Sequence, residues 1–565
     1  MAGAQNFSAT SRSHALTVGT SCPSHLVKRV DQEMKPSAGF LSLPEDLHLY
    51  ILNFLRCRDI LRCTSVCRAL RQTYMSSSEL QYIAELSGQR LLPLRSTNNH
   101  TPVSERLQLL RDRAQAWFKV DIHSFKTVFV PDELDFLPKQ IASGHLCVWD
   151  RDENSAVIMP ILPIPPQQQI QRNWSPGTFS SVPNSTNLNV VMDLAQNLIA
   201  VAYIVDDERL HVDLRALDSD SVHPRAAGRT LSMSELPQRD DSFIETTGGK
   251  LKCYGRHIAM LRCLFAVSGS SSQKLWQLQI WDWQHLTISN SVLGDILQRP
   301  LDRIDFCFLG NNRLLVVTDN LKLYSIEDMS QTPQLLACFS MPIPLEDTQC
   351  LLPMDDIEHS SQPQMQTQQT MYISDPKQQL LCITASASVF IVSTRIFFDL
   401  DGMVVATPIP WDRWGPSNTR IFRHTDECKI HVSGNRVLQA FPVDASVPGH
   451  SRKYILHMMD FSPLAVTNRQ GLGRVVKEPS CTVQTFCSAL GKSEAVTTAT
   501  SLPYVEVVWD RKFGFGELED IWLDKDRIYV LKAGGYLEHG VADYFRAPQP
   551  SRLEVIDIYS RVFNT

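Results

Sequence analysis

The sequence predicts a chain with two unlike parts, a small all-α module with a linker helix and then a large all-β domain. Between Leu41 and Trp117, apolar residues recur every three or four positions, as on one face of an α-helix. Beyond Val120 the period falls to about two, in short runs of β-branched and aromatic residues separated by Gly, Pro, Asn and Asp. At 565 residues the chain is too long for one hydrophobic core, so we expect two or more domains.

The α module is predicted to begin with a helical hairpin in residues 41–74, LSLPEDLHLYILNFLRCRDILRCTSVCRALRQTY. Ser42 and Glu45 have capping-box spacing, and a turn is expected near Cys57-Arg58, with Asp59 as the cap of the second helix. The first helix carries an apolar stripe at helical spacing, formed by Leu47, Tyr50, Ile51, Phe54 and Leu55. The second helix repeats at three or four residues through Ile60, Cys63, Thr64, Cys67, Leu70 and Tyr74.

Both predicted helices have more apolar side chains than one mutual seam can cover. Leu49 and Leu52 lie off the first stripe, and Leu61 and Val66 lie off the second. A unit of this size buries too small a share of its own surface to be stable by itself. The surplus therefore predicts a protein partner.

This segment resembles the F-box motif. Its residues match the LP, L, IL, L, DL, R and VCR elements of that motif without a gap, at Leu43-Pro44, Leu47, Ile51-Leu52, Leu55, Asp59-Ile60, Arg62 and Val66-Cys67-Arg68. One departure from the motif is the turn, which is Arg56-Cys57-Arg58 in this sequence, whereas F-boxes often have proline or another helix breaker there. Periodicity alone leaves open an ordinary amphipathic hairpin inside a larger core.

The resemblance implies binding to the adaptor Skp1 and, through it, to a cullin-based ubiquitin ligase. The Skp1 contacts that it implies are apolar, at Leu43, Pro44, Leu47, Ile51, Leu52, Leu55, Ile60, Val66 and Cys67.

Composition and periodicity divide the chain into four expected segments. Residues 1–38 are rich in Ser, Thr and Gly and are expected to be disordered. Residues 39–90 form the F-box helical domain, with a further helix that Gly88 can end. Residues 91–119 hold a linker helix capped by Ser104, and residues 120–565 form the β-rich domain.

For the β-rich domain the first choice is a WD-like β-propeller. Several apolar runs end like the third strand of a WD-type blade, at Trp149-Asp150, Trp281-Asp282 and Trp509-Asp510. Phrases such as LQIWDWQHL also resemble a group of fungal F-box proteins. The length suits six to eight blades, but irregular spacing leaves a large β-sandwich or paired β-domains open.

Composition and the absence of motifs argue against several kinds of function. A net charge of −6 gives no general attraction to nucleic acid, and no apolar run is long enough to span a membrane. No catalytic or phosphate-binding motif is present, and we expect no metal and no cofactor, although Cys57, Cys63 and Cys67 lie close together. The strand histidines His257, His285 and His431 are expected to be structural, and the charges of GELEDIWLDKD to be solvated.

The leading hypothesis is a non-catalytic substrate receptor of an SCF (Skp1–cullin–F-box) ubiquitin ligase. Its F-box would bind Skp1, and its β-domain would recruit a protein target whose identity the sequence does not reveal. An alternative is an F-box scaffold that binds Skp1 or other partners without promoting degradation, and a third is an enzyme with its site in a propeller channel. Scattered cysteines and the lack of a signal sequence predict a cytoplasmic or nuclear protein.

Overall fold

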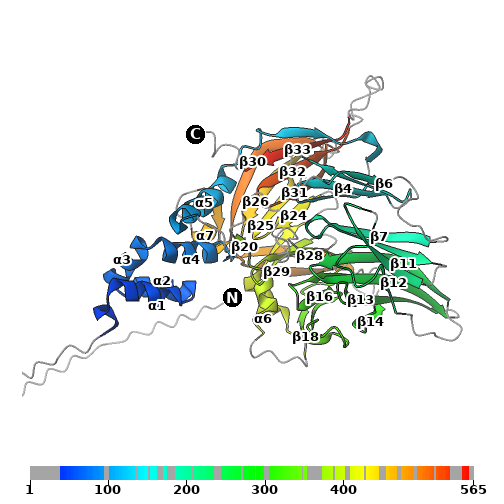
Figure 1. The fold of residues 1–565 in the computed structure, drawn as a ribbon, viewed down its shortest axis with the longest axis horizontal. Coiled ribbons are helices and arrows are strands. Elements are labelled where there is room, and N and C mark those ends of the chain that lie inside the picture. The colour runs from blue at the N-terminus through cyan, green and yellow to red at the C-terminus, as the bar shows by residue number, and fades with distance from the viewer. Residues whose placement is uncertain are drawn as a thin grey trace, which may run out of the picture.

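The computed structural model shows a helical module seated against one side of a β-propeller (Figure 1). The predicted disordered segment, residues 1–38, lies outside the described residues. The structure describes residues 39–94, 101–134, 137–150, 153–161, 170–174, 185–205, 209–219, 221–234, 243–268, 271–286, 288–297, 304–345, 348–352, 372–385, 388–400, 407–424, 428–443, 453–467, 472–487, 493–514, 517–534 and 550–558.

The helical module is a bundle of short helices rather than a simple hairpin. Its elements are η1 (Phe40–Ser42), α1 (Glu45–Asn53), α2 (Cys57–Val66), α3 (Arg68–Ser76) and α4 (Ser78–Gly88). The second predicted helix is therefore wrong as a single element. Cys67 is fully extended, with φ −151° and ψ 165°, and this one residue ends α2 and precedes α3.

The predicted caps of the first two helices are also wrong. Pro44 precedes α1, no side chain caps it, and the Ser42 hydroxyl instead donates a hydrogen bond to the Gly39 carbonyl at 2.7 Å. Asp59 lies inside the first turn of α2, where a carboxylate still suits the positive end of the helix dipole. Helix α4 does have a side-chain cap, because the Leu80 N–H donates to the Ser77 hydroxyl at 3.3 Å.

A small core holds these helices together. Leu52 of α1, Ile60 of α2 and Leu80 of α4 are almost completely buried against one another. Half-buried side chains complete this core, namely Leu49, Leu55, Cys63, Tyr74 and Ile83.

The β domain consists of seven antiparallel sheets of four or five strands arranged as the blades of a propeller. A propeller is thus confirmed, and the β-sandwich and paired-domain alternatives are wrong. Blade 1 has β3 (Lys139–Ala142), β4 (His145–Asp150), β5 (Ser155–Pro160) and β6 (Arg172–Trp174). Blade 2 has β7 (Ser185–Asp193), β8 (Leu198–Val205), β9 (Arg209–Ala216) and β10 (Thr230–Ser232). Blade 3 has β11 (Phe243–Tyr254), β12 (His257–Ser268), β13 (Ser271–Asp282) and β14 (Val292–Leu297).

The second half of the ring repeats this plan with additions. Blade 4 has β15 (Asp305–Phe308), β16 (Arg313–Val317), β17 (Asn320–Ser325) and β18 (Gln334–Ser340). Blade 5 has β19 (Gln349–Leu351), β21 (Leu380–Ala385), β22 (Ser388–Ser393) and β23 (Thr419–Arg423). Blade 6 has β24 (Ile430–Ser433), β25 (Arg436–Pro442), β26 (Lys453–Asp460), β30 (Tyr504–Gly514) and β27 (Arg474–Val476). Blade 7 has β31 (Leu518–Leu523), β32 (Arg527–Lys532), β33 (Arg552–Asp557) and β2 (Lys126–Phe129).

Blade 7 closes the ring by joining the two ends of the domain. Strand β2 comes before blade 1 in the chain, yet it pairs with β33, the last strand, from Lys126 opposite Val555 to Phe129 opposite Arg552. Because this pairing closes the ring, every blade packs between two neighbouring blades.

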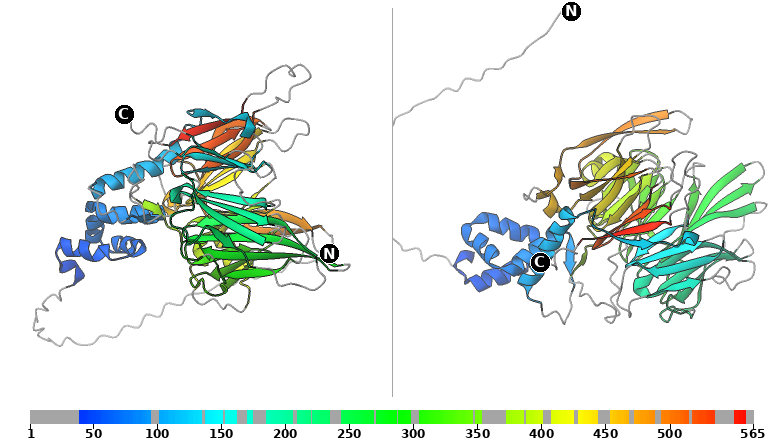
Figure 2. Two further views of the ribbon diagram at one scale, coloured as in Figure 1. Left: turned by 45° about the vertical axis from the view of Figure 1, so that its right-hand side comes forward. Right: turned by 90° about the horizontal axis from the view of Figure 1, so that it is seen from above.

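The remaining elements lie at the edges of the ring. Strand β1 (Leu91–Pro93) pairs with β20 (Tyr372–Ser374), and β28 (Ser480–Cys487) with β29 (Ser493–Thr500) forms a hairpin inserted between β27 and β30. The hairpin lies beside blade 5 in the ribbon views (Figure 2). The Gln484 side-chain amide of β28 donates a hydrogen bond to the Ser388 hydroxyl of β22 at 2.9 Å. The other helices are α5 (Val103–Ala116), η2 (Trp117–Lys119), η3 (Asp132–Leu134), η5 (Leu194–Gln196), η6 (Thr394–Phe397), α6 (Trp411–Asn418) and α7 (Pro463–Thr467).

The cores of the propeller lie between adjacent blades. Trp276 and Leu278 of β13, for example, pack with Phe306 of β15 and Val316 of β16. The Trp-Asp pairs were predicted to end the third strand of a blade, and only one of the three does so. Trp281-Asp282 ends β13, the third strand of its blade, but Trp149-Asp150 ends the second strand β4, and Trp509-Asp510 lies within the fourth strand β30. An apolar run with a polar end is a property of most buried strands, so it does not identify the position within a blade.

Candidate docking face and its mounting on the propeller

Helix α1 presents apolar side chains to solvent. We call Leu47, Tyr50, Ile51 and Phe54 the α1 face, because their spacing of three or four residues places them on one side of the helix. All four are exposed, and Phe54 keeps 73% of its surface accessible. The Tyr50 and Phe54 rings meet edge to face, with centroids 4.9 Å apart.

Neighbouring elements extend the apolar character of this end of the module. Phe40 and Leu41 in η1 are exposed, as are Leu61 and Val66 in α2. Buried His48 positions η1 on α1, because its Nε2 lies 2.7 Å from the Phe40 carbonyl oxygen and its ring contacts the Phe40 ring. Soluble proteins rarely expose so many large apolar side chains on one small unit unless another protein covers them.

The opposite end of the module is covered by the propeller. Tyr82 and Leu86 of α4 pack with Leu107 and Leu110 of α5, and Tyr372 from the propeller completes this cluster. Buried Glu85 of α4 accepts a hydrogen bond from Gln89 at 3.0 Å and one from Arg111 of α5 at 3.3 Å. Helices α4 and α5 therefore act as one unit whose apolar seam continues into the ring.

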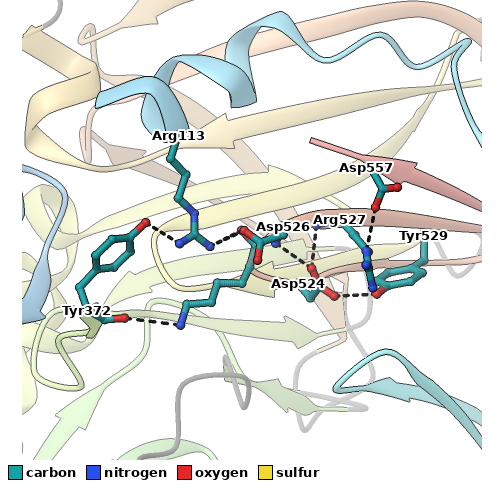
Figure 3. Close-up of polar contacts among 8 residues, drawn as sticks. Arg113, Tyr372, Asp524, Asp526, Arg527, Tyr529 and Asp557 are labelled. Atoms are coloured by element: carbon teal, nitrogen blue, oxygen red, sulfur yellow. Dashed lines mark hydrogen bonds and ion pairs between the residues drawn. The ribbon is translucent and has the colours of Figure 1, made fainter. Parts of the chain in front are cut away.

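Arg113 of α5 makes the central polar contact of this mounting (Figure 3). Its guanidinium donates to the Tyr372 hydroxyl at 2.5 Å, to the Lys525 carbonyl at 2.9 Å and to the Asp526 carboxylate at 2.5 Å. The Arg113 side chain is only 16% exposed, so these partners replace water that burial has removed.

The propeller turn that receives Arg113 is itself rigid. The Asp524 carboxylate accepts the N–H groups of Asp526 and Arg527 at 2.8 Å and 2.7 Å and the Tyr529 hydroxyl at 2.6 Å. Arg527 in turn donates to Asp557 at 2.8 Å, which ties the turn to strand β33 (Figure 3). Burial raises the pKa of Asp524, because desolvation disfavours the carboxylate more than its hydrogen bonds favour it.

Two further contacts secure the module to the ring. Arg90 adopts a left-handed conformation, with φ 58°, at the turn into β1, and its guanidinium donates to the Asn435 side chain at 3.0 Å. Gly88 ends α4, and a Cβ at this position would lie 3.0 Å from the Leu464 Cβ of α7. A side chain at position 88 would therefore require Leu464 or the end of α4 to shift by a few tenths of an ångström.

The mounting uses one face of the propeller. Tyr372, Asn435 and Asp526 lie in the connections between the first and second strands of blades 5, 6 and 7. In an antiparallel blade these connections all lie at one end of the strands, which we call the module face. The connections between second and third strands, and those between blades, lie at the other end, which we call the far face. The ribbon views agree, with the helices seated on one side of the ring (Figures 1 and 2).

Comparison with known proteins agrees with this geometry. Residues 40–77 match the family described as F-box-like. The chain carries an F-box-like module. No curated protein matches the chain significantly.

Solved structures resemble this chain at low identity. An uncharacterized protein from Listeria monocytogenes EGD-e is 11% identical, with a TM-score of 0.28, over 74% of this chain and 91% of that one. Raptor from Chaetomium thermophilum is 7% identical, with a TM-score of 0.32, over 92% of this chain and 39% of that one. AztD from Citrobacter koseri is 8% identical, with a TM-score of 0.25, over 66% and 89%.

The residues predicted to contact Skp1 occupy different environments in the F-box-like module. Pro44, Leu47, Ile51 and Val66 are exposed, whereas Leu43, Leu55 and Cys67 are half-buried. Leu52 and Ile60 lie in the module's own core, where they shape the surface from below. The partner contact itself remains a prediction for all nine residues.

Sequence reasoning about the partner contact omitted Tyr50, Phe54 and Leu61, although all three are exposed in the F-box-like module. Tyr50 and Phe54 belong to the apolar stripe that periodicity identified, so the stripe was a better guide to exposure at these positions than the motif letters. Leu61 was visible as a residue lying off the second stripe.

Two of the strand histidines are held in surroundings that disfavour the charged imidazolium. Burial lowers the pKa of His431 to about 4, and its Nδ1 accepts the Leu523 N–H at 3.2 Å. Burial also lowers the pKa of His257 to about 4, and neither of its ring nitrogens has a hydrogen-bond partner in the described structure.

The acidic run GELEDIWLDKD is not a solvated loop, contrary to expectation. It contains strand β31 and the turn after it. Glu519 pairs with Lys139 at 2.7 Å, and burial raises the pKa of Asp520 to about 6. Loop composition misled the prediction because strand residues with buried ionic partners have the same letters as solvated ones.

None of the described helices is long and apolar enough to cross a membrane. No group of three or more His, Cys, Asp or Glu side chains there is placed to hold a metal ion.

Proposed function

We propose that this protein is a non-catalytic substrate receptor of an SCF ubiquitin ligase, in which the F-box-like module binds Skp1 and the propeller recruits a protein target. F-box domains typically bind Skp1, and the pairing of an F-box with a propeller is typical of adaptor proteins. The observation that carries the proposal is the exposed α1 face within residues matched as F-box-like. The proposal places the complex in the cytoplasm or the nucleus, on sequence grounds.

The α1 face has the chemistry of a protein-binding surface. Its residues are aliphatic and aromatic, and burial of apolar area contributes about 25 cal/mol per Å². Aromatic side chains such as Tyr50 and Phe54 are common energetic centres of interfaces, because they bury a large area with few rotatable bonds. Leu52 and Ile60 stabilise the surface by filling the core beneath it.

The role that we propose for the chain is positioning. A target held on the propeller and an activated ubiquitin held by the ligase would react at a raised effective concentration, without any bond made by the receptor. Such positioning needs a stiff connection. The apolar cluster around Tyr372 and the buried Arg113 contacts supply one between the module and the ring.

Mixing the full chain with purified Skp1 and separating the mixture by size-exclusion chromatography tests the proposal. We expect one peak that contains both proteins. Two separate peaks from a folded chain would overturn it. Reconstituted ubiquitin transfer to a captured target, with a chain lacking residues 41–74 as the control, then separates a substrate receptor from a scaffold that binds Skp1 without promoting degradation.

A further inference from the structure

A pocket opens on the far face of the propeller, between blades 3 and 4. It has a volume of about 330 Å³, near the lower end of the ~300–1,000 Å³ that is usual for binding pockets. The turn between β16 and β17, at Thr318 and Asp319, forms one side, and the last residues of β14 form another. Residues 341–345, which lead from blade 4 towards blade 5, complete the wall.

The position of the pocket relates it to the helical module. The β16–β17 turn joins the second and third strands of blade 4, and residues 341–345 connect two blades, so both belong to the far face. The module occupies the module face, on blades 5, 6 and 7. A molecule in the pocket would therefore not compete with the α1 face or with its mounting.

Apolar side chains supply part of the lining. Trp276 of β13 is almost completely buried and lies opposite Asp295 of β14 in the strand register. Ile343 is buried, and Pro342 and Pro344 beside it are half-buried. This lining can hold an aliphatic side chain or the methylene stem of a long charged one.

The charges around the pocket do not balance. Lys322 lies 3.8 Å from Asp295, at the long limit of an ion pair, and the Asp295 side chain is 59% exposed. Exposed Asp319 accepts hydrogen bonds from the Thr318 hydroxyl at 2.8 Å and the Asn320 amide at 3.2 Å, both of them neutral groups. Among the described residues Asp319 has no cationic partner, so two carboxylates face one ammonium group.

We propose that this pocket binds an extended segment of the recruited protein in which an arginine or lysine adjoins a proline or aliphatic residue. The inference rests on the proposed function, since it assigns the target's chemistry to the receptor's propeller. A guanidinium fits best, because it can pair with the Asp319 carboxylate through two parallel hydrogen bonds while its stem lies on the apolar lining.

The extended shape follows from the strand beside the pocket. β14 is the outermost strand of its sheet in the described structure, so its outer edge can accept a further strand. The two carboxylates disfavour a phosphate or a nucleic acid, because like charges repel. Asp295 and Asp319, both exposed, also make the site too polar for a purely apolar ligand.

The test uses the full chain bound to Skp1 and a displayed library of random twelve-residue peptides. Selection is run on the natural chain, on the double variant Asp295→Asn/Asp319→Asn, and on Asp328→Asn as a matched control. Asp328 lies in the β17–β18 turn of the same blade, on the module face, and its carboxylate accepts hydrogen bonds from the N–H and hydroxyl of Ser330 at 3.0 Å and 2.6 Å. Melting temperatures of the three proteins confirm equal folding.

We expect the natural chain and Asp328→Asn to enrich peptides with Arg or Lys next to Pro, Leu, Ile or Val. The strongest peptide should bind the double variant at least about tenfold more weakly, which corresponds to about 1.4 kcal/mol. Its affinity for the natural chain should fall as salt is added, because the carboxylates are partly exposed.

Three results would overturn the inference: no enrichment, enrichment of acidic or wholly apolar peptides, or the same loss of affinity in Asp328→Asn as in the double variant. The co-elution of chain and Skp1 is measured on the same samples. Loss of that co-elution would refute the proposed function, whereas intact co-elution with any of the three results would refute the pocket alone.

Discussion

The two ends of the helical module differ in what covers their apolar side chains. On α4 and α5, Tyr82 and Leu110 are buried against Tyr372 of the propeller. On α1, Tyr50 and Phe54 remain in solvent. Both ends carry the same helical periodicity, so the pattern shows which side chains need a neighbour but not which molecule supplies it. One end has its partner in the same chain, and we propose that a second chain covers the other.

The largest expected effect is on the uncovered end. Replacing Leu47 and Ile51 together by Ala should abolish co-elution with Skp1, since truncating an apolar side chain buried in an interface costs about 2–5 kcal/mol. The fold should survive, because both residues are exposed in the free chain. Size-exclusion chromatography measures the loss. Phe129→Ala, which truncates an exposed apolar side chain on β2 of the propeller, is the control that should leave co-elution unchanged.

The covered end should respond in the opposite way. Leu110 is fully buried, so Leu110→Ala should lower the free energy of unfolding by about 2–5 kcal/mol. Binding of the folded protein to Skp1 should persist, because Leu110 lies away from the α1 face. Denaturant titration gives the first quantity and co-elution at low temperature the second. A variant that kept full stability would show that the seam between α4, α5 and Tyr372 is not a packed core.

A change of pH should alter the stability of the propeller and leave Skp1 binding by the α1 face unchanged. Burial raises the pKa of Asp520 to about 6 from its ordinary 3.8, so the folded state holds this proton more tightly than the unfolded state. The resulting destabilisation is absent below pH 4, grows as the pH rises to 6, and is complete above it, at up to about 3 kcal/mol. Asp520→Asn should therefore raise stability at pH 7.5 and leave it unchanged near pH 4.

Thermal unfolding of Asp520→Asn across this pH range measures the effect. Skp1 co-elution at pH 7.5 should be the same with and without the substitution, because the α1 face contains no charged side chain. Equal stabilisation of the variant at every pH would contradict the assignment to this carboxylate.

The smallest expected effect is on the stiffness of the mounting. Arg113→Ala leaves the Tyr372 hydroxyl and the Asp526 carboxylate without their donor, but Asp526 is 41% exposed and water can replace part of the loss. We expect stability to fall by about 1–2 kcal/mol, with faster amide exchange in α5. Hydrogen exchange measures this. Arg62→Ala, which breaks the exposed pair with Asp59, should leave exchange in α5 unchanged.

Local physics accounts for the parts of the molecule that the sequence predicted correctly. The helices of the module, the long β-rich remainder and the F-box spacing depend on neighbours within a few positions, and periodicity records these neighbours directly. The break at Cys67 was missed because the residues around it, Val66 and Arg68, are compatible with a continuous helix. The acidic run around Asp520 was misassigned because Lys139, the ion-pair partner of Glu519 in this run, lies in a different blade.

By itself, the sequence determined that amphipathic helices near the amino end carry more apolar surface than they can hide and that most of the chain beyond Val120 forms short strands. Tertiary structure alone decided that seven blades close into a ring through β2, that α4 and α5 are fastened to one face by Arg113, and that a pocket with unbalanced charge lies on the other. The physical reason is how far apart in the sequence the interacting residues lie. Helix and strand periodicity arise from contacts between near neighbours, whereas ring closure, the buried Arg113 contacts and the pocket join residues that are distant in the chain.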